Sequence, residues 1–361
     1  MKVVHVEAGK NLYGGALQVR YLLEGLQTRG VENLLVVAEE SALADALSDS
    51  RIKCYRLPMR GDLDIALIPR LKKILSSESP DIVHLHSRRG ADLLGGLAAR
   101  WAGVKTVVSR RVDNPEPRWW VGLKYRLFDR VITISEGIRR VLLSEGLPPG
   151  CVVCVHSAVD TRLYAGQQCD RNWLNGQFQL DRDSLVVAVV AQLIPRKGHR
   201  FLLQALPVLL DSFPGLRLLV LGKGSSETDI RSQISDLGLS GKVIMGGFRD
   251  DLERIFPCLD LLIHPALMEG LGVSLLQAAA AGVPIVAVDA GGVPEAVRDG
   301  VNGLLVPGGD SRALAAAVTR LLSDPDLARQ MGAAGKHLVE DEFSIDAMVE
   351  GNLAVYRSLV T

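Results

Sequence analysis

Short apolar runs alternate with segments of helical period along most of the chain. In the first pair, the apolar run 3–6 precedes the segment 16–29, in which leucines recur at helical spacing. Further apolar runs and helical segments follow at 33–38, 65–75, 82–86 and 91–102. A strand–helix–strand order requires a parallel sheet with right-handed crossovers and a ligand crevice at the carboxyl ends of its strands. The sequence therefore predicts an α/β fold.

Length and composition allow two such units. A chain of 361 residues, 48% of them hydrophobic, can form two domains that each bury a core. No window approaches the ~18 apolar residues of a membrane helix, and the first ten residues lack the apolar core of a signal peptide. The five cysteines fit a reducing compartment without disulfides, and the pair Cys151 and Cys154 has no second pair at zinc spacing. We therefore predict a cytoplasmic protein.

The net charge is zero but unevenly spread. Residues 1–160 hold 23 Lys and Arg against 18 Asp and Glu, and residues 161–361 hold 18 against 23. The N-terminal part is therefore at +5, which suits an acidic or membrane-surface partner. We predict no binding to nucleic acid, because this excess is small and no nucleic-acid module accompanies it.

The stretch 265–284, PALMEGLGVSLLQAAAAGVP, is the most informative one. Glu269 and a flexible turn with Gly270 and Gly272 lead into an apolar helical run that Gly282 ends. Unpaired N–H groups and the positive dipole end make such a helix start suitable for a phosphate. An ordinary buried strand–turn–helix corner explains the pattern equally well.

Two other turns offer phosphate-binding chemistry. Arg196 and Lys197 follow the buried apolar run 185–191, and two adjacent cations at a strand end can neutralise a diphosphate. Gly14 and Gly15 lie between the first strand and helix, where a plain tight turn is the alternative.

Residues 105–130 combine seven Lys and Arg with three acids and two adjacent tryptophans. Indoles beside cations suit the interface of an anionic membrane. A solvated helix with a partly buried aromatic face is an equal alternative. The residues assigned to acceptor or membrane contact are Arg110, Arg111, Trp119, Trp120, Lys124 and Arg126.

The stretch 265–284 resembles the E-x7-E segment of retaining GT-B glycosyltransferases of family four. Glu269 matches the first acid of that motif, and 282–284 match its Gly-Val-Pro end. The second acid is Gln277 here, and the Gly-Arg of the family's G-R-L-x-P-x-K-G loop is Ala191-Gln192. The resemblance extends from Gly14 to the end of the chain.

The family resemblance implies a GT-B fold, in which two Rossmann-like parallel-sheet domains face each other across a cleft. It places an acceptor-binding domain at 1–165, a linker at 166–184 and a nucleotide-sugar domain at 185–342. The segment 343–361 is then a helix that returns to the first domain.

The resemblance also implies roles for single residues. Glu269 binds the donor sugar and stabilises positive charge at the anomeric carbon, so it is predicted to be catalytic. His86 resembles the family's acceptor-side histidine and is also predicted to be catalytic. We expect only one of His84 and His86 to face the crevice, with His86 preferred as the last residue of its strand. The predicted donor-binding residues are Gly14, Gly15, Arg196, Lys197, Gly247, Phe248, Gly270, Leu271, Gly272, Val273 and Gln277.

The predicted function is a retaining, metal-independent transfer of a sugar from a nucleotide sugar to a membrane-associated glycan or lipid, as in cell-surface polysaccharide or lipopolysaccharide synthesis. We favour a UDP-sugar over a GDP- or ADP-sugar, and expect no cofactor, no metal and no cluster of histidine ligands. The enzyme is expected on the anionic inner face of the cytoplasmic membrane. One alternative is a non-catalytic sugar-nucleotide binding protein, because Gln192 and Gln277 both depart from the family. A nucleotide-sugar epimerase is another.

Overall fold

The computed structural model describes residues 1–12, 14–86 and 90–360. The chain divides into two compact units. Unit 1 comprises Met1–Ala158 and Ile345–Thr361, and unit 2 comprises Val159–Ser344. Each unit is built on one parallel sheet with helices, so the predicted α/β class is confirmed.

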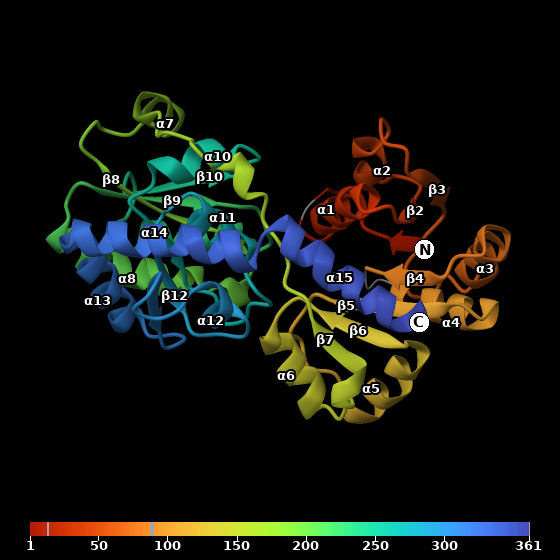
Figure 1. The fold of residues 1–361 in the computed structure, drawn as a ribbon. Coiled ribbons are helices and arrows are strands. Elements are labelled where there is room, and N and C mark those ends of the chain that lie inside the picture. The colour runs from red at the N-terminus through yellow and green to blue at the C-terminus, as the bar shows by residue number, and fades with distance from the viewer. Residues whose placement is uncertain (13, 87–89, 361) are drawn as a thin grey trace. The chain divides into compact units, whose positions relative to one another are not determined.

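The sheet of unit 1 has seven strands in the order β3-β2-β1-β4-β5-β6-β7, and all neighbours are parallel (Figure 1). The strands are β1 (Lys2–Glu7), β2 (Glu32–Ala38), β3 (Lys53–Leu57), β4 (Ile82–Leu85), β5 (Lys105–Arg110), β6 (Arg130–Thr133) and β7 (Val152–Cys154). The order reverses between β1 and β4, and ligands of open α/β sheets bind where it reverses, at the carboxyl ends of the strands. The turns that follow β1 and β4 are therefore the candidate binding turns of unit 1.

Helices connect these strands, and the last helix of the chain also packs in unit 1. They are α1 (Gly14–Thr28), α2 (Ala42–Ala46), α3 (Leu67–Glu78), α4 (Ala91–Ala102), α5 (Arg118–Lys124), α6 (Glu136–Ser144), α15 (Ile345–Val360) and the short 3-10 turns η1 (Tyr125–Leu127) and η2 (Pro149–Cys151). Helix α15 lies against α1, and its Tyr356 is fully buried in a core that includes Val3 and Ile82. Unit 1 therefore depends on two distant parts of the chain.

Unit 2 repeats the plan with six parallel strands in the order β10-β9-β8-β11-β12-β13. The strands are β8 (Leu185–Val190), β9 (Leu216–Leu221), β10 (Val243–Gly247), β11 (Leu261–His264), β12 (Ile285–Val288) and β13 (Gly303–Val306). Its helices are α7 (Arg171–Phe178), α8 (His199–Ser212), α9 (Glu227–Asp236), α10 (Leu252–Ile255), α11 (Val273–Ala280), α12 (Val293–Ala296), α13 (Ser311–Ser323), α14 (Pro325–Glu342) and the 3-10 turns η3 (Thr161–Leu163), η4 (Pro195–Lys197) and η5 (Phe256–Cys258). Here the strand order reverses between β8 and β11.

The apolar runs of the sequence become the central strands because both of their faces are covered. Strand β8, LVVAVV, is buried along its middle, and every residue of β11 and β12 is buried. Polar caps fix several helix starts. Ser135 accepts a hydrogen bond from the backbone N–H of Ile138 at the start of α6.

Some elements were not expected from the sequence. Helix α7 lies inside the segment 166–184, for which we expected no regular period. The segment 105–130 begins with the buried strand β5 and not with a surface helix. Strand β3 at one edge of the sheet is partly exposed, so its sequence KCYRL lacks a continuous apolar run.

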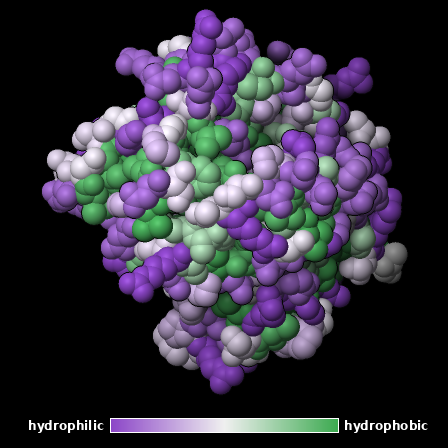
Figure 2. Space-filling view, turned by 90° about the vertical axis from the view of Figure 1, so that its left-hand side faces the viewer, coloured by the Kyte–Doolittle hydropathy of each residue, from purple (hydrophilic) through white to green (hydrophobic). Residues whose placement is uncertain are grey.

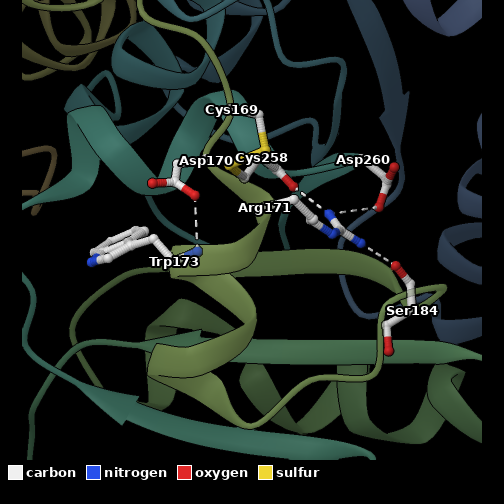
Figure 3. Close-up of a disulfide and its surroundings, with 7 residues drawn as sticks. All are labelled: Cys169, Asp170, Arg171, Trp173, Ser184, Cys258 and Asp260. Atoms are coloured by element: carbon white, nitrogen blue, oxygen red, sulfur yellow. Dashed lines mark hydrogen bonds and ion pairs between the residues drawn. A yellow bond between two sulfur atoms is a disulfide. The ribbon is translucent and has the colours of Figure 1, made fainter.

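Cys169 and Cys258 form a disulfide, so the expectation of a chain without disulfides is wrong (Figure 3). The bond joins Cys169, two residues before α7, to the end of η5, and Arg171 lies beside it. The Arg171 guanidinium donates hydrogen bonds to the backbone carbonyls of Cys258, at 2.8 Å, and of Ser184. These contacts attach α7 to the rest of unit 2.

Small hydrophobic patches alternate with hydrophilic side chains on the face drawn in Figure 2. Such mixing is ordinary, because apolar atoms supply more than half of the surface of most folded proteins. Among the described residues, no helix combines the length and the apolar character that crossing a bilayer requires.

Candidate active site

The loops after β8 and β11, where the strand order of unit 2 reverses, bring Lys197 and Glu269 together. Lys197 ends the 3-10 turn η4, and Glu269 lies in the loop between β11 and α11. The Lys197 ammonium and the Glu269 carboxylate form an ion pair, with their side chains only 10% and 14% exposed. Two residues that are 72 positions apart in sequence therefore meet where a ligand of this fold is expected.

Glu269 is held by more than this one partner. His264, the last residue of β11, lies with Nε2 at 2.9 Å from Glu269 Oε2, and the backbone N–H of Gly270 donates to Oε1 at 3.1 Å. The backbone N–H of Gly292 donates to the Glu269 carbonyl at 3.0 Å. The carboxylate is therefore held by Lys197, His264 and Gly270, and the contact of Gly292 holds the backbone of Glu269.

These contacts also keep Glu269 ionised. Burial alone would raise its pKa, but the hydrogen bond and charge of His264 and the charge of Lys197 bring the pKa down to about 2. Glu269 is thus an anion at neutral pH, as a group that stabilises positive charge on a sugar ring must be. His264 was not singled out from the sequence, although a histidine at the end of the strand that delivers Glu269 was a usable signal.

Helix α11 begins at Val273, one short glycine turn after Glu269. Gly272 precedes its first residue with φ 88°, a conformation that favours glycine, and no side chain caps the helix start. Val273 and Gln277 lie one turn apart and are both partly exposed, whereas Leu271 is buried. The uncapped N–H groups of α11, in an eight-residue helix, thus open beside Glu269.

Gly198 shows how closely the two loops pack. Its φ is 70°, and a Cβ at this position would lie 1.9 Å from the carbonyl oxygen of Pro265. No side chain larger than hydrogen fits there. Gly198 therefore allows Lys197 to approach the loop that carries Glu269.

The turns after β9 and β10 lie beside the turn after β8. The N–H of Gly222 donates to the Gly247 carbonyl at 2.7 Å, and the N–H of Leu193 donates to the Lys223 carbonyl at 3.0 Å. The ring of Phe248 is 44% exposed, with Lys223 Nζ 5.8 Å from its centroid. The predicted donor-binding residues Gly247 and Phe248 thus adjoin the turn after β9, and that turn contacts the loop that ends in Lys197.

Arg196 directly precedes Lys197 in the 3-10 turn η4. It lines a pocket of about 500 Å³ together with His199, Arg200 and Asp229, and its backbone carbonyl accepts a hydrogen bond from Leu267. Arg196 stays a predicted donor-binding residue, and the exposed Gln192 occupies the position of the family's arginine.

In unit 1, the turns after β1 and β4 carry the remaining predicted residues. Gly14 opens α1 with φ 27°, and a Cβ on Gly15 would lie 3.5 Å from Cδ of Arg111. His86 is 2% exposed at the end of β4. Residue 13 and residues 87–89, which flank these turns, lie outside the described part of the chain.

His84 and His86 lie on the same face of the sheet, and which of them faces the crevice stays a prediction. Their ring centroids lie 3.8 Å apart, and both rings pack against His5 of β1. The physical reason is the period of a strand, since residues two positions apart point to the same face.

The basic and aromatic segment separates into a buried and an exposed part. Arg110 is paired with Glu116 at 3.1 Å, and Lys124 with Asp92 at 2.8 Å. Both cations are almost fully buried, which is incompatible with the predicted contact to lipid headgroups. Of the predicted membrane residues, Trp119 is 72% exposed, Arg126 is exposed and Trp120 is partly exposed, and the neighbouring Leu123 is exposed as well.

The expectation of no histidine cluster at ligand spacing is also wrong. Ring nitrogens of His5, His84 and His86 all lie within 4.8 Å of one another. Acidic pairs of Asp-x-Asp form do occur in the sequence, at 62–64, 181–183 and 324–326, but Asp64 is paired with Arg70 and Asp324 caps α14. These two aspartates therefore have structural partners.

Comparisons with known proteins place this chain in a family. The model for glycosyl transferases group 1 matches residues 171–338, and the model for glycosyltransferase family 4 matches residues 13–163. A GDP-mannose-dependent α-(1-6)-phosphatidylinositol monomannoside mannosyltransferase of Mycolicibacterium smegmatis is 31% identical over 291 residues, covering 76% of this chain and 75% of that relative. The chain belongs to the family-four glycosyltransferases.

Other relatives of this glycosyltransferase match over its whole length. The lipopolysaccharide core biosynthesis glycosyltransferase LpsE of Rhizobium meliloti is 26% identical over 361 residues, covering 99% of both chains. The structure of HepE from Anabaena in complex with UDP and glucose has a TM-score of 0.86 at 21% identity, covering 99% of this chain and 100% of that one. The fold is therefore GT-B, and the enzyme class is glycosyl transfer.

Proposed function

We propose that this enzyme transfers a sugar from a nucleotide sugar to a membrane-associated glycan or lipid, with retention at the anomeric carbon and without a metal ion. The observation that carries the proposal is the buried pair of Lys197 and Glu269 beside the uncapped start of α11. A cation, an anion and free N–H groups are the three kinds of group that such a transfer uses.

Each group has a place in the reaction. The bond between the anomeric carbon and the diphosphate oxygen breaks, and the acceptor oxygen bonds to that carbon while its proton goes to the departing diphosphate. Lys197 and the N–H groups of α11 would stabilise the negative charge of the leaving group, as a metal ion does in other transferases. Glu269 would stabilise the positive charge that develops on the sugar.

Donor binding requires the ion pair to open. Lys197 is bound to Glu269, and a diphosphate would compete for its ammonium while the hydrogen bond from His264 keeps Glu269 oriented. We favour a UDP-sugar because the structural relatives include complexes with UDP and UDP-glucose. GDP- and ADP-sugars are the competing donors, and one relative is named as GDP-mannose-dependent.

The acceptor is proposed to lie at an anionic membrane surface. Two relatives are named for lipopolysaccharide core synthesis and for a phosphatidylinositol mannoside. Trp119, Leu123 and Arg126 on and after α5 offer exposed apolar and cationic groups for such a surface. Sedimentation with anionic vesicles should weaken when Trp119 and Trp120 are replaced by alanine, and equal binding to neutral vesicles would contradict the proposal.

A donor and acceptor screen tests the activity. The protein is incubated with UDP-, GDP- and ADP-sugars in the presence of rough lipopolysaccharide or a phosphatidylinositol mannoside, and nucleotide release and product mass are scored. Product formed in the presence of a chelator, with the anomeric configuration of the donor, is the expected result. Inversion at the anomeric carbon would overturn the proposed retention, and loss of activity on chelation would overturn the proposed metal independence.

A non-catalytic sugar-nucleotide binding protein is the competing function, because two of the positions that are charged in the family carry Gln192 and Gln277 here. The variant Glu269→Gln separates the two functions. An enzyme should lose transfer but keep nucleotide binding, whereas equal transfer by both proteins would make Glu269 a structural residue.

A further inference from the structure

Three buried histidines of unit 1 pack together, and two of them, His5 and His86, form a hydrogen-bonded chain with Asn33. His5 lies on β1, His84 on β4 and His86 directly after β4, and the register of the sheet places His5 beside His84. All three are at most 2% exposed, and Asn33 on the neighbouring strand β2 is 7% exposed. Buried polar groups are nearly always hydrogen-bonded, so we expect each ring nitrogen to bond to another histidine, to a nearby protein group or to a ligand.

Asn33 determines the direction of the first hydrogen bond. Its amide Nδ2 donates to the backbone carbonyls of Leu23 at 3.3 Å and Val31 at 3.2 Å. The amide oxygen consequently faces Nε2 of His5 at 3.3 Å. An amide oxygen can only accept, so His5 must carry its proton on Nε2.

The proton on His5 in turn determines the proton on His86. Burial lowers the pKa of His5 to about 4, so this ring is neutral at pH 7 and its Nδ1 is an acceptor. That Nδ1 lies 3.0 Å from Nε2 of His86, which must therefore donate. Burial, followed by the charges of His84, His5 and Arg111, also lowers the pKa of His86 well below its usual value.

One ring nitrogen of the group is then left over. With its proton on Nε2, neutral His86 has a lone pair on Nδ1, and this buried atom has no hydrogen-bond partner among the described residues. His84 does not compete for it. Its two nitrogens bond to the hydroxyls of Tyr356 at 2.5 Å and Ser109 at 2.8 Å.

We propose that Asn33 and His5 are positioning residues that hold His86 in the tautomer whose Nδ1 accepts a hydrogen bond from a hydroxyl of the sugar acceptor. The inference rests on the proposed function and on the family resemblance, which assigns His86 to the acceptor side. It adds the direction of the hydrogen bonds, Asn33 accepting from His5 and His5 accepting from His86. A hydroxyl donor is the chemistry that fits a neutral ring nitrogen with a free lone pair.

The nitrogens of the three histidines also have the spacing of metal ligands, so a metal site is the alternative to the hydrogen-bonded chain. Five of the six ring nitrogens already have hydrogen-bond partners. The charge of Arg111 acts on both His84 and His86, and its pKa-lowering effect on them would equally disfavour a cation. These contacts favour the hydrogen-bonded group over a metal site.

Nitrogen NMR of the whole protein tests the tautomer without any substrate. The chain is labelled with ¹⁵N-histidine, and the signals of its seven rings are assigned with single His variants. At pH 7, Nδ1 of His86 should give the signal of an unprotonated ring nitrogen and Nε2 that of a protonated one. A proton on Nδ1 would overturn the proposal, as would stoichiometric binding of added Zn²⁺ with a change of the His86 signals.

Variants at position 5 test the positioning role. In His5→Asn the amide oxygen can occupy the place of Nδ1, so the His86 signals should persist. His5→Leu removes the acceptor, and the proton of His86 should then redistribute between both nitrogens. Ser109→Ala, which removes a contact of His84 outside the Asn33–His5–His86 chain, is the matched control and should leave His86 unchanged. An unaltered His86 spectrum in His5→Leu would exclude a positioning role for His5.

The transfer assay separates this inference from the proposed function. His5→Leu should lower kcat/KM for the acceptor about tenfold, the effect of one neutral hydrogen bond, while His5→Asn restores it. Nucleotide affinity should not change, because the predicted nucleotide-binding residues of unit 2 are intact. If the tautomer is as proposed but His86→Ala transfers sugar normally, the acceptor role of His86 fails and the hydrogen-bond direction stands. If the enzyme is active but Nδ1 of His86 carries the proton, the proposed hydrogen-bond direction fails and the proposed function stands.

Discussion

Acid should destabilise unit 1 through its buried histidines, and His5 gives the clearest case. Burial lowers the pKa of His5 from 6.5 to about 4, and the hydrogen bond to Asn33 only partly opposes this shift. Between these two pH values the unfolded chain binds a proton that the folded chain does not. The stabilisation is therefore complete above about pH 6.5 and is lost as the pH falls to about 4. A shift of this size corresponds to about 3 kcal/mol for His5 alone.

The variant His5→Asn removes this titration and keeps an acceptor toward His86. Urea unfolding between pH 7.5 and 4 should show a flatter pH dependence for the variant, with a difference approaching 3 kcal/mol across the window. Tryptophan fluorescence can follow unit 1 in a Trp173→Phe background, because Trp101, Trp119 and Trp120 all belong to that unit. If the free energy of unfolding has the same pH dependence in the parent and in His5→Asn, the reasoning is refuted, because His5 would then have the same pKa in the folded and unfolded chain.

Three further predictions concern unit 2. Lys197→Ala should lower kcat/KM by about 2–4 kcal/mol in transition-state stabilisation, or roughly 30- to 1000-fold, and unchanged kinetics would remove Lys197 from the site. Gln277→Glu should keep or improve nucleotide affinity in isothermal titration, because a charged acceptor makes a stronger hydrogen bond to a ribose hydroxyl; a large loss would place Gln277 elsewhere. Without reductant, the denatured protein should show three reactive thiols of its five cysteines, and reducing the bond between Cys169 and Cys258 should cost about 2–4 kcal/mol of stability. Five reactive thiols before reduction would contradict the disulfide.

The sequence predicted the central elements well because their apolar runs are buried on both faces. The predicted runs 82–86 and 185–191 agree with the bounds of β4 and β8 to within one residue, and the helical segment 91–102 agrees with α4. Elements at the margins were missed. Helix α7 buries only Leu174 and Phe178, so its sequence has no sustained apolar period.

The candidate site was predictable where it depends on short motifs and not where it depends on register. Glu269 and Lys197 each follow a buried strand, so the parallel sheet brings both to the same edge. His264, the partner of Glu269, could have been predicted in the same way, because it ends the strand that precedes Glu269. The hydrogen bonds of His5 could not be predicted, because they depend on the register of β1 with β2 and β4, which the sequence alone does not give.

Unit 1 is made from two separated parts of the chain, and this determines the order in which the protein can fold during its synthesis. Unit 2 is continuous, from Val159 to Ser344, so all of its strands have been translated before α15 is made. Until then unit 1 lacks Tyr356, the hydroxyl partner of His84, and the apolar face that covers α1. On the ribosome the N-terminal unit must therefore wait for its last helix while the following unit completes its core. A chain truncated before α15 would preserve that unfinished state.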